Sequence, residues 1–263
     1  MIMSKKNEIS NFIKKSEKVY ILSKEDSLIS HDIPFEDNYS DSIKIKIEAK
    51  SPIFIRNHYQ EGDDNYEVEK DGEKIKISKE FCHYNKIPYI PASSIKGMIR
   101  NSVEIISYGR LKGKTLDEYL EDRIKDSSSL HKSDSIDLSD AIFGTTELKG
   151  RVQFSHFKCK NFGKDKTENV KQEILMTPEA KENKFGWKNY PIKDGLSSAK
   201  KSNNENVVSE FKPLKSGIIF EGHVRFHNLR AFELGAILSA LSFHSTSDCY
   251  HNIGLAKSLG LEK

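Results

Sequence analysis

The sequence predicts an α+β fold, in which an antiparallel sheet carries helices on one of its faces. Segments in which apolar residues alternate with polar ones, as in half-buried strands, are interrupted twice by segments with helical spacing. The order along the chain is strand, helix, strands, helix, and this order is typical of such two-layer folds. With 263 residues, the chain can bury a substantial core as one large domain or two small ones.

The first strand of the sheet is predicted over residues 43–47, where isoleucine alternates with lysine and one face is half-buried. Residues 67–78 predict a hairpin, because alternating residues flank an Asp-Gly pair that suits a tight turn. Upstream of both, the apolar residues within 9–13 predict a short helix.

The first long helix is predicted over residues 94–108, with isoleucine, methionine and valine at helical spacing on a buried face. Pro88 and Pro91 hold the chain extended up to its start. Ser93 or Ser94 is expected to cap the helix by accepting a hydrogen bond from a backbone N–H two or three residues further on.

Two cations follow these serines: Lys96 and Arg100 lie four residues apart on the polar face of the predicted helix. A lysine in the first turn faces the positive end of the helix dipole, which costs about 0.3–1 kcal/mol. The free N–H groups of a helix start also bind phosphate, so an anion would offset this cost. We therefore expect Ser93, Ser94, Lys96 and Arg100 to grip a polyanion. An ordinary capped helix with a solvated lysine is an equally open interpretation.

The rest of the chain completes the pattern. A short helix is predicted over residues 115–124, a strand over 150–157, another strand over 217–227 and a helix over 230–243. The long stretch 158–215 has little periodicity, as functional insertions and disordered segments do. The predicted organisation is an N-terminal extension, the first part of the core, an insertion, and the second part of the core ending in a glycine-rich loop, at residues 1–41, 42–157, 158–215 and 216–263.

This order of elements predicts the ferredoxin-like (RRM-like) variant of the α+β class, elaborated by insertions. That fold closes with a further strand after its second helix. Only three residues follow Gly260, so the final strand is apparently missing. We expect it to come from elsewhere, such as a partner chain, or this chain to be a shortened member of its class.

The composition permits nucleic-acid binding without requiring it. The net charge is +3 and the pI about 8.5, and most of the 42 basic residues are lysines, which favour sequence-independent phosphate contacts. Solvated surface lysines explain the same composition equally well. No apolar run approaches the roughly 20 residues of a membrane span and no signal peptide is apparent, so we expect a cytoplasmic protein. The three cysteines, at 82, 159 and 249, have no spacing typical of a disulfide framework or a zinc site.

The segment Pro-Tyr-Ile-Pro-Ala-Ser-Ser-Ile-Lys-Gly-Met-Ile-Arg, residues 88–100, resembles the signature of the RAMP superfamily, the RNA-binding backbone subunits of type III CRISPR effector complexes. Ala92 stands where that signature usually has glycine. The likeness covers about residues 28–261. Further segments resemble one single-chain RAMP subfamily in the same order, at residues 31–37, 47–56, 98–109, 141–144, 150–155, 226–236 and 251–260.

The resemblance implies a ribonucleoprotein subunit for antiviral defence. Its partners would be guide RNA, target RNA and other RAMP subunits stacked in a filament, with no membrane. Lys257, in the glycine-rich loop, would contact the RNA. The 158–215 insertion would be a thumb that wedges between base pairs, and Phe185, Trp187 and Tyr190 would stack on bases, each contributing about 1–3 kcal/mol. These aromatic residues could equally anchor the insertion on the core.

The resemblance also implies a candidate catalytic group. In cleaving members of the superfamily, an aspartate in the loop after the first strand cuts target RNA with a divalent ion. Here that loop contains Asp63 and Asp64, and neighbouring carboxylates suit Mg²⁺ or another divalent metal. A solvated turn is the competing interpretation of this Asp-Asp pair. No other metal ligands are assigned.

Two further functions remain open from the sequence. The first is a metal-independent endoribonuclease that processes precursor guide RNA, with His58 or Tyr59 in acid–base roles. The second is a non-catalytic structural assembly subunit.

Overall fold

The computed structural model describes residues 11–14, 33–70, 72–107, 136–146, 148–163, 167, 170–172, 186–189, 209–242 and 250–255. Its main feature is a six-stranded antiparallel sheet, and the predicted α+β class is confirmed. Five strands lie in the order β2-β12-β8-β6-β5, and β7 also pairs with β12. Their bounds are Tyr39–Glu48 (β2), His83–Tyr84 (β5), Ile87–Ile90 (β6), Val152–Phe154 (β7), Phe157–Cys159 (β8) and Ile219–Leu229 (β12).

β2 and β12 form the longest pair of the sheet, with Ile43 opposite Val224 and Ile47 opposite Phe220. These apolar residues point to one face, where Val224 and Phe220 are fully buried. The lysines of β2 alternate onto the other face, as the period of two predicts. Among the described strands β2 has a partner on one side only, so it forms an edge of the sheet.

The strand predicted over residues 150–157 is divided in two. β7 ends at Phe154 and β8 begins at Phe157, and both pair with β12. Between them, the Ser155 hydroxyl accepts a hydrogen bond from the backbone N–H of His223 at 2.8 Å. The side chain thereby takes the place of a ladder partner, and the strand is interrupted.

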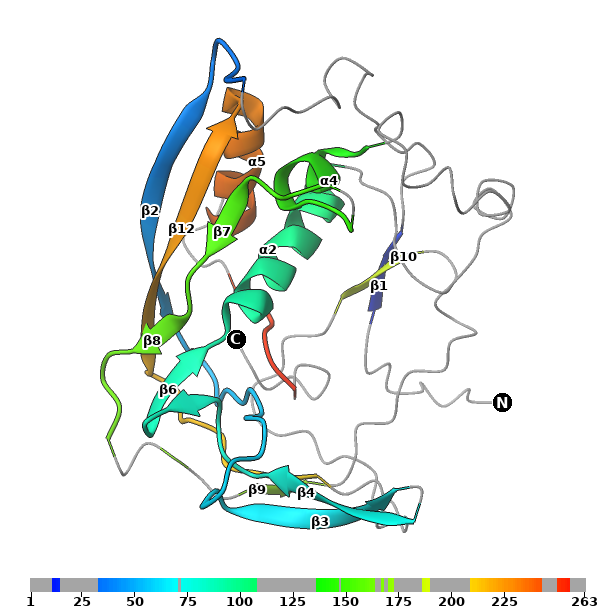
Figure 1. The fold of residues 1–263 in the computed structure, drawn as a ribbon, viewed down its shortest axis with the longest axis vertical. Coiled ribbons are helices and arrows are strands. Elements are labelled where there is room, and N and C mark those ends of the chain that lie inside the picture. The colour runs from blue at the N-terminus through cyan, green and yellow to red at the C-terminus, as the bar shows by residue number, and fades with distance from the viewer. Residues whose placement is uncertain are drawn as a thin grey trace, which may run out of the picture.

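Two longer helices and a short one cover one face of the sheet: α2 (Ala92–Ile106), α4 (Leu138–Phe143) and α5 (Ala231–Ser242) (Figure 1). Asp137 caps α4, because its carboxylate accepts a hydrogen bond from Asp140 N at 2.8 Å. The sequence did not predict this short helix.

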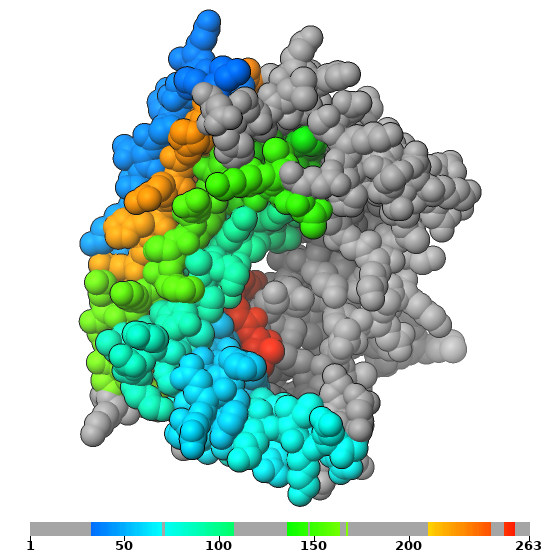
Figure 2. Space-filling model, viewed as in Figure 1, coloured from blue at the N-terminus to red at the C-terminus, as the bar shows by residue number. Residues whose placement is uncertain are grey.

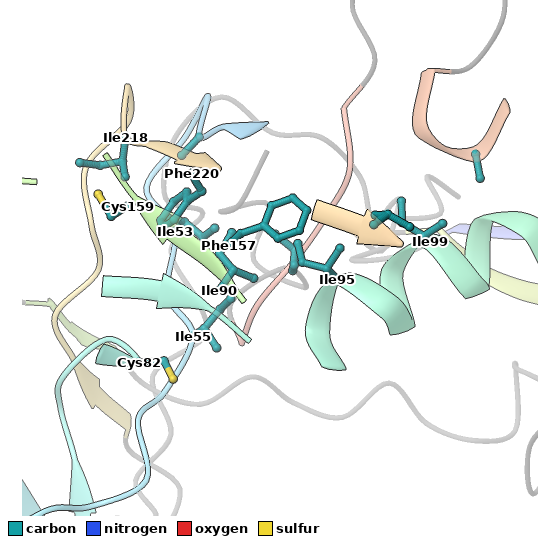
Figure 3. Packing of buried hydrophobic residues seen from close by; sticks show 14 of the residues in the cluster. Ile53, Ile55, Cys82, Ile90, Ile95, Ile99, Phe157, Cys159, Ile218 and Phe220 are labelled. Carbon is teal, nitrogen blue, oxygen red and sulfur yellow. The ribbon is translucent and has the colours of Figure 1, made fainter. Parts of the chain in front are cut away.

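The core lies between the sheet and these helices. One hydrophobic cluster contains Ile95 and Ile99 of α2 together with Phe157 and Phe220 of the sheet, and all four are at most 1% exposed (Figure 3). A buried ion pair between Arg151, next to β7, and Glu233 of α5 links the sheet to the second helix, with Arg151 Nη1 donating to Glu233 Oε2 at 2.8 Å.

Smaller pairings lie outside the main sheet. β3 (Asn65–Lys70) and β4 (Glu73–Ser78) form the predicted hairpin. β9 (Val170–Gln172) pairs with β11 (Ser209–Phe211). The short helix predicted within residues 9–13 is wrong, since β1 (Asn11–Lys14) pairs antiparallel with β10 (Gly186–Asn189). This pairing joins segments that lie far apart in the sequence, which local periodicity cannot anticipate.

Three sequence predictions fall on residues outside the described ones. These are the helix over residues 115–124, the glycine-rich loop after residue 255 and the position of a final strand. Of the predicted insertion, the end nearest the second half of the core is buried, because Phe211 and Leu214 are part of the main hydrophobic cluster.

Candidate nucleic-acid interface

The N-terminus of α2 lies at the end of β6, where Pro91 is the N-cap residue, with φ −57° and ψ 141°. The helix begins at Ala92, two residues before the predicted start. Pro91 makes this possible because its ring presets the backbone angle needed next to the first turn. The proposed cap is therefore wrong: neither Ser93 nor Ser94 caps the helix, and no side-chain cap is present.

The first-turn donors are only partly used. Ala92 N–H donates to His156 Nδ1 at 3.1 Å, and Ser94 N–H donates to the Pro91 carbonyl at 3.0 Å. Ser93 is exposed, and its N–H has no hydrogen-bond acceptor among the described residues. The first turn contains no acidic residue. No carboxylate within the first turn therefore compensates its partial positive charge.

Lys96 lies in this first turn and is partly exposed. Its pKa lies below the usual value, first because of partial burial and second because of the nearby Arg100 guanidinium. Within the described part of the chain it has no ion-pair partner. A bound anion would offset both the partial burial of the Lys96 ammonium and its repulsion by Arg100. The position therefore favours negative charge.

Arg100 has a different environment from Lys96. Its Nε donates to Glu104 at 2.9 Å, Nη2 donates to Asp140 at 3.0 Å, and Nη1 donates to the Gly144 carbonyl at 2.9 Å. Glu104 and Asp140 are both buried. The guanidinium therefore links α2 to α4 and forms ion pairs with two buried carboxylates. The contact of Arg100 with RNA stays a prediction, whereas its hydrogen bonds to Glu104, Asp140 and Gly144 show a structural role.

Gly97 adds space beside this turn. A Cβ placed there would meet no atom within 4 Å, so neither packing nor backbone angle requires glycine at this position. Glycine inside a helix costs about 1 kcal/mol relative to alanine. Together with Ser93, Ser94 and Lys96, it leaves space at the helix start, whose first turn contains no acidic residue.

Two residues that sequence reasoning missed border this surface. His156 orients the first N–H of α2, and its ring lies 4.7 Å from the ring of Tyr89 on β6. With Nδ1 accepting, the proton of a neutral His156 is on Nε2, which makes that atom a further donor. Tyr89 stays protonated, because its hydrogen bond with Cys82 and its burial raise its pKa to about 12. His156 lies between β7 and β8, and only this position could have indicated that it accepts a hydrogen bond from the start of α2.

The Asp63 carboxylate is buried inside the 57–64 loop. Its Oδ2 accepts from Asn57 Nδ2 and Ser78 Oγ, both at 3.1 Å, and from Gln60 N at 3.3 Å. Its Oδ1 lies 3.2 Å from His83 Nε2 and 3.4 Å from Lys86 Nζ. Burial alone would raise the pKa of Asp63, but these hydrogen bonds outweigh it and the pKa lies below the usual value.

Asp64 points to the surface instead. Its carboxylate lies 2.9 Å from Lys212 Nζ and 4.0 Å from Lys79 Nζ. The hydrogen bond from Lys212 is the largest effect on the pKa of Asp64 and lowers it. The two aspartates therefore do not converge on a common point.

These surroundings fit a divalent metal poorly. Mg²⁺ keeps several waters and needs near-octahedral oxygen ligands. Both oxygens of Asp63 are already used by N–H, O–H and ammonium donors, and two lysine ammonium groups lie beside Asp64. Among the described residues, no three His, Cys, Asp or Glu side chains are grouped as a metal site. Catalysis by Asp63 or Asp64 stays a prediction without geometric support.

The alternative acid–base residues also lack an arranged partner. His58 is exposed and has no hydrogen-bond partner among the residues that the structure describes. Tyr59 is partly buried, with Lys76 Nζ 5.8 Å from its ring centre. A general base is normally oriented by a third group, and the described residues place none beside His58.

The other predicted RNA contacts lie outside the described residues or side chains. Phe185, Tyr190 and Lys257 are not among the described residues, and for Trp187 only the backbone, in β10, is described. Their predicted contacts with RNA are therefore untested by this structure.

Comparison with known proteins identifies the family. The family model of the RAMP superfamily matches residues 46–261 of the chain. The chain belongs to the RAMP superfamily. The match includes all of the α2 surface described above, the strands β6, β7, β8 and β12, and α5. No curated protein matches this RAMP chain.

Two solved structures have a low similarity to this RAMP chain. One is described as "Cryo-EM structure of the Type III-B Cmr-beta bound to cognate target RNA", with 15% identity and a TM-score of 0.37, covering 78% of this chain and 51% of that one. This RAMP chain thus spans about half the length of that relative. The other is described as "Type IV-B CRISPR Complex", with 16% identity and a TM-score of 0.40, covering 84% and 87% of the two chains.

Within the described part of this RAMP chain, every helix is too short or too polar to cross a lipid bilayer.

Proposed function

We propose that this RAMP protein is an RNA-binding backbone subunit of a CRISPR effector complex, and that it holds guide RNA by its phosphates at the N-terminus of α2. The observation that carries the proposal is the first turn of that helix. It combines an N–H at Ser93 that has no acceptor among the described residues, the hydroxyls of Ser93 and Ser94, and the ammonium of Lys96, and the turn itself contains no acidic residue.

Phosphate contacts suit such a subunit better than base contacts. A guide changes from one target to the next, so a protein that carries many guides must hold what they share. Backbone N–H groups, hydroxyls and a lysine all bind phosphate oxygens without selecting a base. The partners we propose are guide RNA, target RNA and neighbouring RAMP subunits.

The direct test is binding of a labelled, unstructured single-stranded RNA of about 20 nucleotides, the length of a typical guide pairing region. Lys96→Gln should weaken binding severalfold and lower the salt slope by about 0.7, as expected for one lost phosphate contact on a single strand. Lys74→Gln, on the exposed strand β4, is the matched control and should leave binding unchanged. Equal binding by wild type and Lys96→Gln would contradict the proposal.

Gly97 provides a second test with opposite effects on folding and binding. Gly97→Ala should stabilise α2 by about 0.5–1 kcal/mol, because alanine is the better helix former and the space is open. The added methyl group should nevertheless weaken RNA binding by blocking close approach to the first turn. Unchanged RNA affinity in a more stable variant would place the phosphate elsewhere.

A further inference from the structure

The face of the six-stranded sheet opposite the helices is open. α2, α4 and α5 lie on the other face (Figure 1), and no described element covers this one. In Figure 2 the same strands form a continuous band of blue, orange and green along one side of the molecule. The side chains on this open face come from alternate positions of the strands, and all are exposed or partly exposed.

Strand register places these side chains in rows. Lys46 of β2 lies opposite Glu221 of β12, Glu221 lies opposite Lys158 of β8, and Lys158 lies opposite Tyr89 of β6. Neighbouring strands are about 4.8 Å apart, so Lys46 and Lys158 flank Glu221 at about 10 Å from each other. In the same way, Arg225 occupies a further row along β12, opposite Ser42.

The charge on this open face is strongly positive. Its two carboxylates are Glu48 and Glu221, and Glu48 lies 2.9 Å from Lys50. Glu221 lies 3.1 Å from Lys44 Nζ and 3.6 Å from Lys160 Nζ, so it holds two cations in place. The remaining cations of the face have no ion-pair partner within the described part of the chain; they are Lys46, Lys158 and Arg225.

An exposed aromatic residue lies at the β5 edge of this face. Tyr84 pairs with Ile87 of β6, and because Ile87 and Tyr89 are two residues apart, all three point to the same side. Tyr84 is 75% exposed and Ile87 is 54% exposed. His83, which pairs with Pro88, points to the opposite side and is buried. Tyr84 therefore adds an exposed aromatic ring to the face that also holds Tyr89 and Lys158.

We infer that this open sheet face is a second contact surface for single-stranded RNA, with Lys46, Lys158 and Arg225 on phosphates and Tyr84 stacked on a base. This inference rests on the proposed function, since it concerns the same ligand class at a different surface. Cations that track the backbone, together with aromatic rings that accept any base, are the combination that binds single strands without sequence preference.

The electrostatic half of the inference is tested with Lys46→Gln combined with Lys158→Gln. Binding of unstructured single-stranded RNA should weaken roughly tenfold, and the salt slope should fall by about 1.4, for two lost phosphate contacts. Lys74→Gln combined with Lys76→Gln is the matched control, because it removes the same charge from the exposed strand β4. If both double variants weaken binding equally, only net charge matters and the inference is wrong.

Two single variants separate the inference from a folding defect. Tyr84→Ala should weaken RNA binding with no change in salt slope, because stacking releases no counterions. Glu221→Gln should tighten RNA binding severalfold, since it removes a carboxylate from the face and frees Lys44 and Lys160. Tighter binding by a Glu221→Gln variant that keeps the wild-type circular dichroism spectrum is therefore not explained by a folding defect. Unchanged or weaker binding by Glu221→Gln would overturn the inference.

The outcomes also distinguish this surface from the α2 surface. If wild-type protein does not bind RNA, the proposed function and this inference both fail. If Lys96→Gln weakens binding while the Lys46/Lys158 variant does not, the function stands and the inference fails. Polyglutamate serves as a probe for an acidic protein partner. If the Lys46/Lys158 variant binds polyglutamate less tightly than wild type does but binds RNA equally well, the face contacts an acidic protein and the inference is wrong.

Discussion

Asp63 Oδ1 lies 3.2 Å from His83 Nε2, and both side chains are buried where the 57–64 loop meets strand β5. The same carboxylate accepts hydrogen bonds from Asn57 and Ser78, so one side chain connects three segments that are separate in the sequence. His83 Nδ1 has no hydrogen-bond partner among the described residues. The loop is thus organised around a buried anion.

Replacing Asp63 by alanine should destabilise the protein substantially. It leaves the buried donors of Asn57, Ser78 and His83 without an acceptor, and each buried unsatisfied donor costs about 1–3 kcal/mol. We expect the free energy of unfolding to fall by more than about 2 kcal/mol in a urea titration. Asp64→Ala, at an exposed ion pair, should change it by less than about 1 kcal/mol. Similar losses for the two variants would show that the buried contacts contribute little.

Acid should destabilise the protein partly through Asp63. Its pKa is lower in the folded state than in the unfolded chain, so its stabilising contribution is complete above the unfolded value of about 3.9. That contribution is lost as the pH falls from about 3.9 through the lower folded-state pKa. In Asp63→Asn, the decline of unfolding free energy below about pH 4 should be shallower than in wild type. Parallel acid limbs for the two proteins would contradict the assignment.

Arg100 and Lys96 should separate folding from RNA binding. Arg100→Gln leaves the buried carboxylates of Glu104 and Asp140 without their guanidinium, and should lower stability by about 3 kcal/mol. Lys96→Gln removes a partly exposed charge that is not paired within the described residues, and should change stability by less than about 0.5 kcal/mol. Thermal unfolding monitored by circular dichroism distinguishes the two. A stable Arg100→Gln variant would show that the ion pairs are dispensable.

Gly222 should tolerate no side chain. A Cβ at this position in β12 would lie 2.0 Å from Cδ1 of Phe157, which is completely buried. Gly222→Ala should therefore cost about 1–3 kcal/mol through overpacking. Gly235→Ala in α5 is the control, because nothing lies within 4 Å, and it should stabilise by about 0.5–1 kcal/mol. Destabilisation by both would indicate that backbone flexibility, not packing, decides the effect.

The predicted metal-dependent cleavage of target RNA can be tested without relying on stability. Asp64→Asn preserves shape and should leave the fold intact, because the carboxylate is almost half exposed. The lysines beside Asp64 and the donors around Asp63 favour a protein that does not cut RNA with these residues. We expect wild type and Asp64→Asn to give the same intact target RNA with Mg²⁺. Cleavage by wild type that is lost in Asp64→Asn would restore the catalytic interpretation.

Local patterns predicted the elements that have a strong period. The alternation within residues 43–47 predicted β2, and the helical spacing that includes Ile95 and Ile99 predicted α2. The start of α2 was misplaced because two serines suggested a cap, whereas Pro91 is the N-cap residue and no side-chain cap is present. The break between β7 and β8 depends on the contact of Ser155 with His223, 68 residues away, which no local pattern reveals.

The candidate site was only partly predictable for the same reason. Lys96 could be chosen from its position in the first turn of a helix. Arg100 looked equivalent, because its partners Asp140 and Gly144 lie about 40 residues further along the chain. The open sheet face could be recognised only once the register of the strands was known. That register places Lys46 and Lys158 on either side of Glu221. The lysines that alternate with the isoleucines of β2 were the only local pattern that indicated a basic sheet face.

The central place of β12 has a consequence for biosynthesis. β2, β7 and β8 all pair with this strand. Ile43 of β2 pairs with Val224, which is synthesised 181 residues later. Contacts of such long range slow folding. At about 5–20 residues per second, a ribosome would hold the earlier strands unpaired with their final partner for roughly ten seconds or more. Chaperone occupancy of the nascent chain should therefore persist until β12 emerges, and fall after that.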